Sequence, residues 1–283
     1  MLERTVVGFI HNPSVTEATA LVDSLVKSLK LENTSWVCPS SDIDSGVTEQ
    51  ILADTLVIFT VGGDGTILSA VRVAAPHSVP IVGINMGRVG FMTELTIDNA
   101  VAMAAKYLDG WRRIEERMML RTTVEGSGES VAVDALNDVV VSRSEARLLD
   151  VHVKVDGANL YTYRADGLIA ATATGSTGYA LSAGGPIIYP EAKVMQIQPL
   201  AAHLSFQTGV IVSGDSTIEV TTGEHGATLT VDGFVATTLG PDDRLVVRRS
   251  PHVARFLRAA PPADFFASLT ARLGIGPRPL PPS

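Results

Sequence analysis

The chain has one cysteine, few aromatic residues and no excess of basic charge. Cys38 cannot form an internal disulfide, and its place in the apolar run TSWVC predicts a small buried side chain in a reducing compartment. The first ten residues include Glu3 and Arg4, so we expect no signal peptide. Together these features predict a cytoplasmic protein.

Basic clusters and long apolar runs are also absent from the sequence. The net charge is −8, and no group of Lys and Arg alternates with aromatic residues, which argues against nucleic acid as a partner. The densest basic stretch, residues 244–258, alternates with apolar residues, and we expect an edge strand there. The longest uncharged stretch, residues 167–190, is rich in Thr, Ser, Gly and Pro. A bilayer span needs about 20 mostly apolar residues, so we expect no membrane partner.

Several common catalytic motifs are missing. The sequence contains no Walker-A motif G-x-x-x-x-G-K-[ST], no H-E-x-x-H, no C-x-x-C and no G-x-S-x-G. Leu68 stands where the dinucleotide fingerprint would have its third glycine, which weakens a hydride-transfer interpretation. The six histidines are scattered, and we expect them to be structural.

Residues 1–110 alternate between strand and helix patterns, as in a doubly wound α/β domain. Ser14 and Glu17 have the spacing of a capping box. The short apolar runs predict strands, and the apolar stripes at helical spacing predict helices. The expected strands are residues 4–10, 56–60 and 79–85, and the expected helices are residues 20–31, 67–75 and 97–108.

Residues 111–260 read as a β-rich second domain. Its strand-like stretches alternate with period two and are separated by turn signals such as Asp156-Gly157 and Asp232-Gly233. A helix within residues 261–275 is expected to pack back on the body, and residues 276–283 are expected to form a flexible tail. The strand-like stretches are residues 119–125, 130–143, 148–157, 159–171, 210–222, 227–239 and 244–250.

The stretch TVGGDGT, residues 60–66, places one carboxylate among three glycines. It follows a predicted buried strand and precedes a predicted helix, and ligands bind at such turns in open α/β sheets. One interpretation is a glycine-rich turn in which Asp64 is only the N-cap of the helix. The other is a ligand site, and the turn by itself leaves both open.

A second unusual segment, residues 163–190, collects threonine, serine and glycine with almost no charge. Such a segment can offer backbone N–H groups and hydroxyls to a polyanion without a bulky side chain in the way. The alternative is a solvated loop of low complexity. Residues 180–183 are apolar enough to begin a helix, whose N-terminus would point at the ligand.

Three stretches together make the chain resemble the NAD kinase family: GGDGT at 62–66, Asn137-Asp138, and DGLIAATATGSTGYALSAGGPI at 166–187. The resemblance covers nearly the whole length. It implies transfer of the terminal phosphoryl group of ATP, another nucleoside triphosphate or polyphosphate to the adenosine ribose 2′-hydroxyl of NAD, giving NADP. It also implies the two-domain fold described above.

Two other functions stay open at this point. GGDGT is shared with lipid kinases of the diacylglycerol type, which would want an apolar acceptor groove or a basic patch facing a membrane. A non-catalytic NADP(H)-binding sensor on the same fold is the other alternative. The intact Asp64 argues against a sensor.

The resemblance implies roles for individual residues of the first domain. Asp64 matches the general base that accepts the proton of the attacking hydroxyl. Gly65 and Phe91 would lie against NAD. No dedicated metal ligands are expected, and Mg²⁺ or another divalent cation would arrive with the triphosphate. The implied donor-phosphate residues are Gly62, Gly63, Gly65 and Thr66.

In the second domain, Asn137 and Asp138 match an Asn-Glu pair that holds the adenosine and ribose of NAD. Arg164 and Asp166 match an Arg-x-Asp that reaches the nicotinamide half, partly from a neighbouring subunit. The resemblance therefore implies a homodimer or homotetramer. The implied adenine-binding stretch is Thr177, Gly178, Tyr179, Ala180, Leu181 and Ser182.

The chain departs from the family pattern at a few of these positions. Asp138 is one methylene shorter than the usual Glu, and Gly178 replaces the usual Ala. Phe234 stands where a polar residue is common, and Gln207 begins a strand that often starts with Arg-Pro. None of these changes removes the expected base. The phosphoryl donor, the preference for NAD or NADH and any feedback by NADP(H) stay open.

Overall fold

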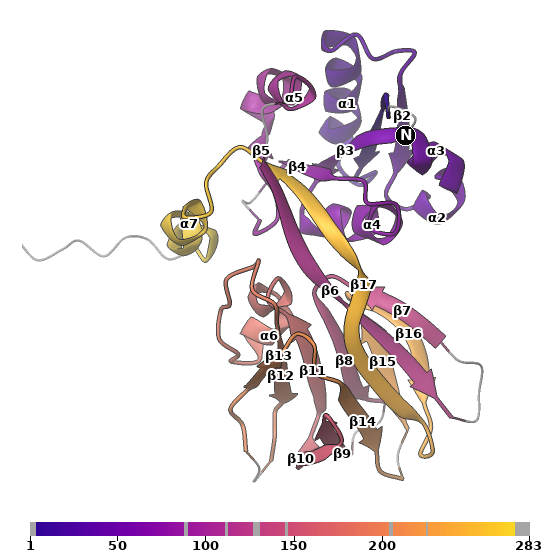
Figure 1. Cartoon of the computed structure of the whole chain (residues 1–283), viewed down its shortest axis with the longest axis vertical. Helices are drawn as coiled ribbons and strands as arrows, with labels where there is room; N and C mark the ends of the chain where they lie inside the picture. Colours follow the sequence, from indigo (N-terminus) through magenta and orange to yellow (C-terminus); the bar gives the residue numbers. More distant parts are fainter. Residues whose placement is uncertain are drawn as a thin grey trace, which may run out of the picture. The chain divides into compact units, whose positions relative to one another are not determined.

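The computed structural model describes residues 4–87, 90–110, 113–126, 131–144, 147–203, 206–224 and 226–274. The chain divides into two compact units. The first comprises Met1–Glu115 and Arg255–Ser283, and the second comprises Glu116–Ala254. Strands β6 (Arg113–Glu125) and β17 (Arg244–Arg258) carry the chain from one unit to the other (Figure 1). The flexible tail predicted for residues 276–283 lies outside the described residues.

The first unit contains a parallel sheet in which β2, β1, β3 and β4 are neighbours in that order. β5 and the end of β17 both pair with β4, the latter at Phe256 opposite Ile81. The central strands are buried along almost their whole length, as their continuous apolar sequences predict. The bounds are β1 (Val6–His11), β2 (Ser35–Pro39), β3 (Thr55–Gly62), β4 (Ile81–Asn85) and β5 (Leu95–Thr96).

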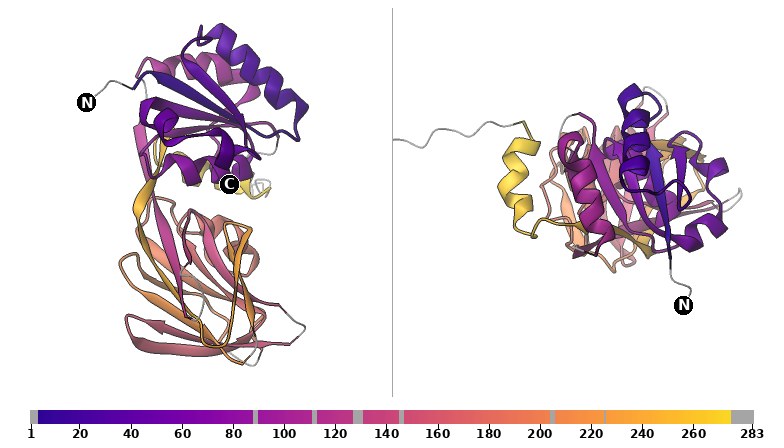
Figure 2. Two further views of the ribbon diagram at one scale, coloured as in Figure 1. Left: turned by 90° about the vertical axis from the view of Figure 1, so that its right-hand side faces the viewer. Right: turned by 90° about the horizontal axis from the view of Figure 1, so that it is seen from above.

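Helices cover this sheet in the doubly wound arrangement (Figure 2). A core that includes Phe9 and Phe59 of the sheet also takes in Leu25 of α1 and Ala104 of α5. The two phenylalanine rings stack with centroids 5.7 Å apart. Cys38 is buried, as predicted. The helices are α1 (Thr16–Ser28), α2 (Ile43–Gly46), α3 (Glu49–Asp54), α4 (Asp64–Ala74), η1 (Ile97–Asn99), α5 (Ala100–Leu108) and α7 (Asp264–Arg272).

Two details of the predicted helices are wrong. The N-cap of α1 is Val15, without a side-chain cap among the described residues, so the capping box of Ser14 and Glu17 does not form. The amide of Ser14 instead donates to Asn12 Oδ1 at 3.0 Å, which turns the chain before the helix begins. The predicted helix 97–108 opens with one 3₁₀ turn, which a capping box between Thr96 and Asn99 fixes.

The second unit consists of two sheets with one core between them. The core draws on both sheets, with Val139 and Leu229 from one and Val151 and Leu245 from the other. One sheet has the strand order β13-β12-β11-β8-β15-β16, and the other joins β10, β9, β14, β17, β6 and β7. The bounds are β7 (Val131–Ala135), β8 (Asp138–Arg143), β9 (Leu149–Val155), β10 (Ala158–Ala165), β11 (Gly167–Thr172), β12 (Val194–Leu200), β13 (Val210–Ser213), β14 (Ile218–Thr222), β15 (Ala227–Val231) and β16 (Phe234–Leu239).

The predicted turns join two hairpins of this unit. Asp156-Gly157 connects β9 to β10, and Asp232-Gly233 connects β15 to β16. All four residues have positive φ, as tight hairpin turns require. The prediction of an edge strand at residues 244–258 is wrong, because β17 pairs with β14 and also with β6. Its alternation reflects one face in the core and the other exposed, a pattern that edge and interior strands share.

Strand β12 was not among the predicted strands. Gln196 and Gln198 give it a polar alternation and Pro199 interrupts it, yet all three are buried. In the part of the chain that the structure describes, no helix is long and apolar enough to cross a membrane.

Candidate active site

Asp64 lies where β3 ends and α4 begins, at the carboxyl edge of the parallel sheet. Its carboxylate does not cap its own helix, whose N-cap is Gly63, so that interpretation of the glycine-rich turn is wrong. The carboxylate instead accepts two hydrogen bonds from the loop that follows β4. Phe91 N donates to Oδ2 at 2.9 Å and Met92 N donates to Oδ1 at 3.2 Å.

The glycines around Asp64 differ in what surrounds them. A Cβ on Gly90 would lie 2.2 Å from Asp64 Oδ1, so a side chain at position 90 would displace either the carboxylate or the loop. A Cβ on Gly62 would lie 2.3 Å from Thr66 Oγ1. Cβ atoms on Gly63 and Gly65 would meet nothing within 4 Å. The open side of the turn is therefore at Gly63 and Gly65.

The open side coincides with the N-terminus of an eleven-residue helix, α4. No side chain of the described residues caps its first amides. A free helix N-terminus attracts phosphate through its N–H groups and its dipole. Of the four predicted donor-phosphate residues, Gly62 ends β3, Gly63 is the N-cap of α4, and Gly65 and Thr66 lie in the first turn of that helix.

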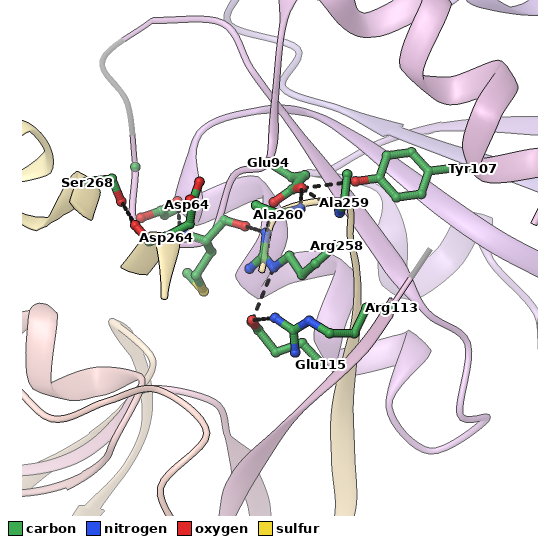
Figure 3. Close-up of polar contacts among 12 residues, drawn as sticks. Asp64, Glu94, Tyr107, Arg113, Glu115, Arg258, Ala259, Ala260, Asp264 and Ser268 are labelled. Carbon is green, nitrogen blue, oxygen red and sulfur yellow. Dashed lines mark hydrogen bonds and ion pairs between the residues drawn. The ribbon is translucent and has the colours of Figure 1, made fainter. Parts of the chain in front are cut away.

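A buried ionic network contacts the loop whose amides hydrogen-bond to Asp64, and Figure 3 shows this network. Arg258, 5% exposed, donates to Met92 O at 2.9 Å, to Glu94 Oε2 at 3.3 Å and to Glu115 Oε1 at 3.2 Å. Glu94 Oε1 also accepts the Tyr107 hydroxyl at 3.0 Å and the amide of Ala259 at 2.8 Å. Burial, and then Glu94, raise the pKa of Tyr107, so its hydroxyl stays a donor. The network ties the end of β17 to the segment that follows β4.

In the second unit, the turn that carries Asn137 and Asp138 is held by Asp232. The Asp232 carboxylate accepts the amides of Leu136 and Asn137 at 2.7 Å each and that of Asp138 at 3.1 Å. The sequence marked Asp232 only as a turn residue, because its contact lies 95 positions away along the chain. Asp232 therefore joins the residues that shape the site.

Asp138 is 6% exposed. Burial, and then the charge of Asp232, raise the pKa of the Asp138 carboxyl from 3.8 to about 7. A carboxyl in this position can therefore hold a proton near neutral pH and donate a hydrogen bond, which an ionised carboxylate cannot do.

The Thr/Ser/Gly segment packs directly on this turn. Thr172 N donates to Asn137 O at 2.8 Å, and Thr172 Oγ1 donates to Leu136 O at 2.6 Å. A Cβ on Gly175 would lie 2.1 Å from Asn137 O, and one on Gly178 would lie 3.9 Å from both Asn137 Nδ2 and Asp138 Oδ2. The structure thus brings Asn137, Asp138 and Gly178 together, although the sequence separates them widely.

A cavity of about 400 Å³ gathers three more of the predicted residues, Asp166, Tyr179 and Ser182. Arg143, which the sequence analysis missed, lines it as well and pairs with Asp166 at 3.0 Å between Nε and Oδ1. Arg143 ends β8 while Asp166 precedes β11, so no local pattern could have joined them. The other lining residues are Ser142, Ala183, Leu200 and Ala201.

The remaining predicted residues are not among those that line this cavity. Thr177 ends η2 (Gly175–Thr177), and its Oγ1 donates to the carbonyl of the N-cap residue Thr174 at 3.0 Å. Ala180 and Leu181 belong to α6 (Tyr179–Ser182), a single turn where a helix was expected to begin. Arg164 is exposed on β10 and is not among the residues that line the cavity. Phe91 contacts Asp64 through its backbone, and its side chain is half-buried.

The described residues hold no cluster of three or more His, Cys, Asp and Glu side chains that could bind a metal ion.

A parallel α/β unit with an acidic residue at an open helix N-terminus, followed in the chain by a β-rich unit with a polar cavity, is the arrangement expected of a two-domain kinase that acts on a nucleotide. Residues 27–111 match the family profile described as "ATP-NAD kinase N-terminal domain", and residues 118–259 match "ATP-NAD kinase C-terminal domain". The chain belongs to the NAD kinase family. It is an enzyme with NAD kinase activity.

Curated relatives agree with this assignment. An NAD kinase of Chloroflexus aggregans is 37% identical over 283 residues, covering 96% of this chain and 99% of the relative. An NAD kinase of Moorella thermoacetica is 41% identical over 224 residues, covering 78% of this chain and 71% of the relative.

Solved structures share the fold. An NAD kinase from Archaeoglobus fulgidus in complex with ATP has a TM-score of 0.74 at 26% identity, covering 96% of this chain and 99% of that one. Yeast NADH kinase complexed with NADH has a TM-score of 0.87 at 21% identity, covering 100% of this chain and 91% of that one. The two-domain fold predicted from the sequence is confirmed.

Proposed function

We propose that this chain transfers the terminal phosphoryl group of ATP to the 2′-hydroxyl of the adenosine ribose of NAD, with Asp64 as the general base. The observation that carries the assignment of the base is the carboxylate at the carboxyl edge of the sheet, held by the amides of Phe91 and Met92. A carboxylate has about four lone-pair positions, so two remain for a substrate hydroxyl.

A carboxylate is a weak base toward an alcohol, but phosphoryl transfer tolerates one. The transition state is loose, proton loss can come late, and catalysis depends mainly on positioning and charge stabilisation. Asp64 orients the hydroxyl and takes its proton as the O–P bond forms. The β-phosphate oxygen of ATP leaves with the electrons of the broken bond.

The donor phosphates would bind at the first turn of α4. The proposed donor-phosphate residues are Gly62, Gly63, Gly65 and Thr66. Cβ atoms at Gly63 and Gly65 would meet nothing within 4 Å, which leaves room for the phosphates beside these two glycines. Mg²⁺ or another divalent cation belongs to the nucleotide substrate in this proposal and offsets the charge of its oxygens. Likeness to an NAD kinase solved in complex with ATP supports ATP as the donor.

In this proposal the second unit supplies the contacts to the adenosine of NAD. Asn137 and Asp138 hold the adenosine, and the half-exposed ring of Tyr179 beside the cavity offers a face for adenine to stack on. Asp166 and Ser182 supply polar groups in the same cavity. The full proposed set is Asp64, Gly65, Phe91, Asn137, Asp138, Arg164, Asp166, Thr177, Gly178, Tyr179, Ala180, Leu181 and Ser182.

A homodimer or homotetramer in the cytoplasm completes the proposal, with Arg164 and Asp166 serving the nicotinamide half partly across subunits. The two outer strands of the six-stranded sheet carry exposed apolar side chains, Ile211 on β13 and Val235 on β16, and outer strands are natural contacts between copies. Light scattering of the purified protein measures the mass. A monomer at assay concentration would contradict this part.

The function is tested by product formation. Purified protein is mixed with Mg²⁺, ATP or polyphosphate as donor, and NAD or NADH as acceptor, and product is read with a dehydrogenase specific for NADP(H). We expect NADP from ATP and NAD. If no combination yields NADP(H) while NADP binds in a titration, the protein is a sensor and the proposal is wrong.

A further inference from the structure

Residues 90–92, whose amides hydrogen-bond to Asp64, also accept hydrogen bonds from two arginines of the C-terminal segment. Arg272, the last residue of α7, donates through Nη1 to Gly90 O. Arg258 donates through Nη1 to Met92 O at 2.9 Å. The amides of Phe91 and Met92 are the two donors to the Asp64 carboxylate. Both arginines therefore act on the backbone that holds the base.

We propose that Arg272 is a positioning residue for the general base, acting through the peptide group between Gly90 and Phe91. The carbonyl of this peptide group accepts the Arg272 hydrogen bond, and its N–H donates to Asp64 Oδ2 at 2.9 Å. The inference rests on the proposed role of Asp64 and extends it to the C-terminal helix.

The arrangement is effective because one rigid, planar peptide group joins the two contacts. A guanidinium on the carbonyl makes a charge-assisted hydrogen bond, which fixes the plane of the peptide. It also polarises the group, so its N–H becomes a better donor. The Asp64 carboxylate is thereby held in one orientation toward the substrate hydroxyl.

Arg272 is anchored for this role within α7. Its Nε donates to Ser268 Oγ at 2.9 Å, and Ser268 Oγ in turn donates to Asp264 O at 2.7 Å; Figure 3 shows the latter pair together with Asp64. The guanidinium is half-buried. Its pKa is lowered by burial and then by Arg258, while Asp64, Glu94 and Glu115 act in the opposite direction. Asp64 is thus one of the charges that the cation feels.

Arg258 is less suitable than Arg272 for a mutational test of this proposal. It is 5% exposed and paired with Glu94 and Glu115, and removing one partner of a buried pair strongly destabilises a protein. Arg272 hydrogen-bonds to two neutral oxygens, Ser268 Oγ and Gly90 O, and within the described part of the chain no ion pair is recorded for it, so its loss should be less damaging to the fold.

The test compares the full-length variants Arg272→Met, Arg272→Lys and Thr270→Ala in the NADP-forming reaction. Thr270 is an exposed neighbour on α7 and is the control for general effects on the helix. We expect Arg272→Met to lower kcat by about 10- to 100-fold, the range for losing a hydrogen bond from a charged donor. The KM values for ATP and NAD should stay within about twofold, since no substrate contact is lost. Arg272→Lys should recover most of kcat.

Asp64→Asn supplies the second arm. If Arg272 acts through Asp64, then Arg272→Met should lower the residual rate of Asp64→Asn by less than about twofold. A raised KM for ATP at unchanged kcat would make Arg272 a direct phosphate ligand and overturn the proposal. Unchanged kcat in Arg272→Met would also overturn it.

Amide exchange separates this inference from the proposed function. The Phe91 amide should exchange at least about fivefold faster in Arg272→Met than in the wild type, whether or not NADP is formed. If the wild type makes no NADP but this exchange responds, the function is wrong and the contact stands. If exchange at Phe91 is unchanged, Arg272 does not position the loop.

Discussion

Gly90 determines at the residue scale where the proposed base can lie. A Cβ at this position would come within 2.2 Å of Asp64 Oδ1, and the carboxylate is already held by two amides of the same loop. A side chain at position 90 would therefore shift the carboxylate, the amides that hold it, or both. The placement of the base therefore depends on a missing side chain in a different segment.

We expect Gly90→Ala to lower the rate of NADP formation by about 100-fold, because a displacement of about 1 Å at a reacting group can cost that much. The midpoint of thermal unfolding should change little, since a single side chain is displaced. Gly87→Ala is the matched control, because its Cβ would meet nothing within 4 Å. Equal activity of the two variants would contradict the proposed role of the loop.

Asp138 gives a second prediction at this scale, a dependence of stability on pH. Its pKa rises from 3.8 to about 7 on folding, so the folded protein favours the protonated form. The resulting stabilisation is complete below about pH 4 and is lost as pH rises through about 7. We expect Asp138→Asn to remove this loss. The variant should gain up to about 4 kcal/mol relative to the wild type between pH 4 and pH 8, at about 1.4 kcal/mol per pKa unit.

Denaturant unfolding at several pH values measures the difference. Asp215→Asn is the control, because that carboxylate is 81% exposed and pairs with Arg249 at the surface. Such pairs contribute about 1 kcal/mol at most. Parallel pH profiles for the wild type and Asp138→Asn would show that Asp138 does not titrate in this range.

At the scale of elements, the contact between the Thr172–Gly178 loop and the Leu136–Asp138 turn organises the proposed NAD site. The two glycines of the loop make opposite predictions. Gly175→Ala would drive a Cβ into the backbone of Asn137, at 2.1 Å from its carbonyl oxygen. Gly178→Ala would bring its Cβ no closer than 3.3 Å to Gly175 O.

We expect Gly175→Ala to lose about 1–3 kcal/mol of stability, the usual cost of overpacking, and to bind NAD more weakly. Gly178→Ala should fold normally and bind NAD within about threefold of the wild type, since its nearest contact needs only a small adjustment. Thermal unfolding and NAD titration of both variants check this. Similar behaviour of the two would mean that the loop does not rest on the Asn137 turn.

The strand, turn and helix around Asp64 could be predicted because the signals are local. An apolar run, three glycines and an apolar stripe follow one another between Leu56 and Ala75. The partners of Asp64 could not be predicted, since Phe91 and Met92 belong to the next strand's loop. The interior position of β17 could not be predicted for a related reason. Alternation of apolar and polar residues reveals which face of a strand is buried, but not which strands lie beside it.

The same limit applies to the proposed NAD site. Asn137, Asp138 and the loop around Gly178 were found through a family resemblance, and each occupies a recognisable motif. Asp232 and Arg143 have no such motif, and only the folded chain brings them to Asn137 and Asp166. The raised pKa of Asp138 likewise depends on burial and on Asp232, neither of which the sequence displays.

At the scale of the whole molecule, the chain leaves the first unit through β6 and returns to it through β17. The returning segment places Arg258 and α7 behind the loop that holds Asp64. The unit that carries the proposed base is therefore complete only when the C-terminal segment has been added. Within this unit, Asp64 is the proposed general base of NAD phosphorylation.

Asp64→Asn tests that claim most directly. The variant keeps the shape of the side chain but presents only one acceptor oxygen to two backbone donors, so its unfolding midpoint is measured alongside its activity. We predict that the rate of NADP formation falls by at least about 1,000-fold, because positioning and proton acceptance are both lost. NAD should still bind within about threefold of the wild type in a titration. A folded variant that forms NADP within about tenfold of the wild-type rate would contradict the account.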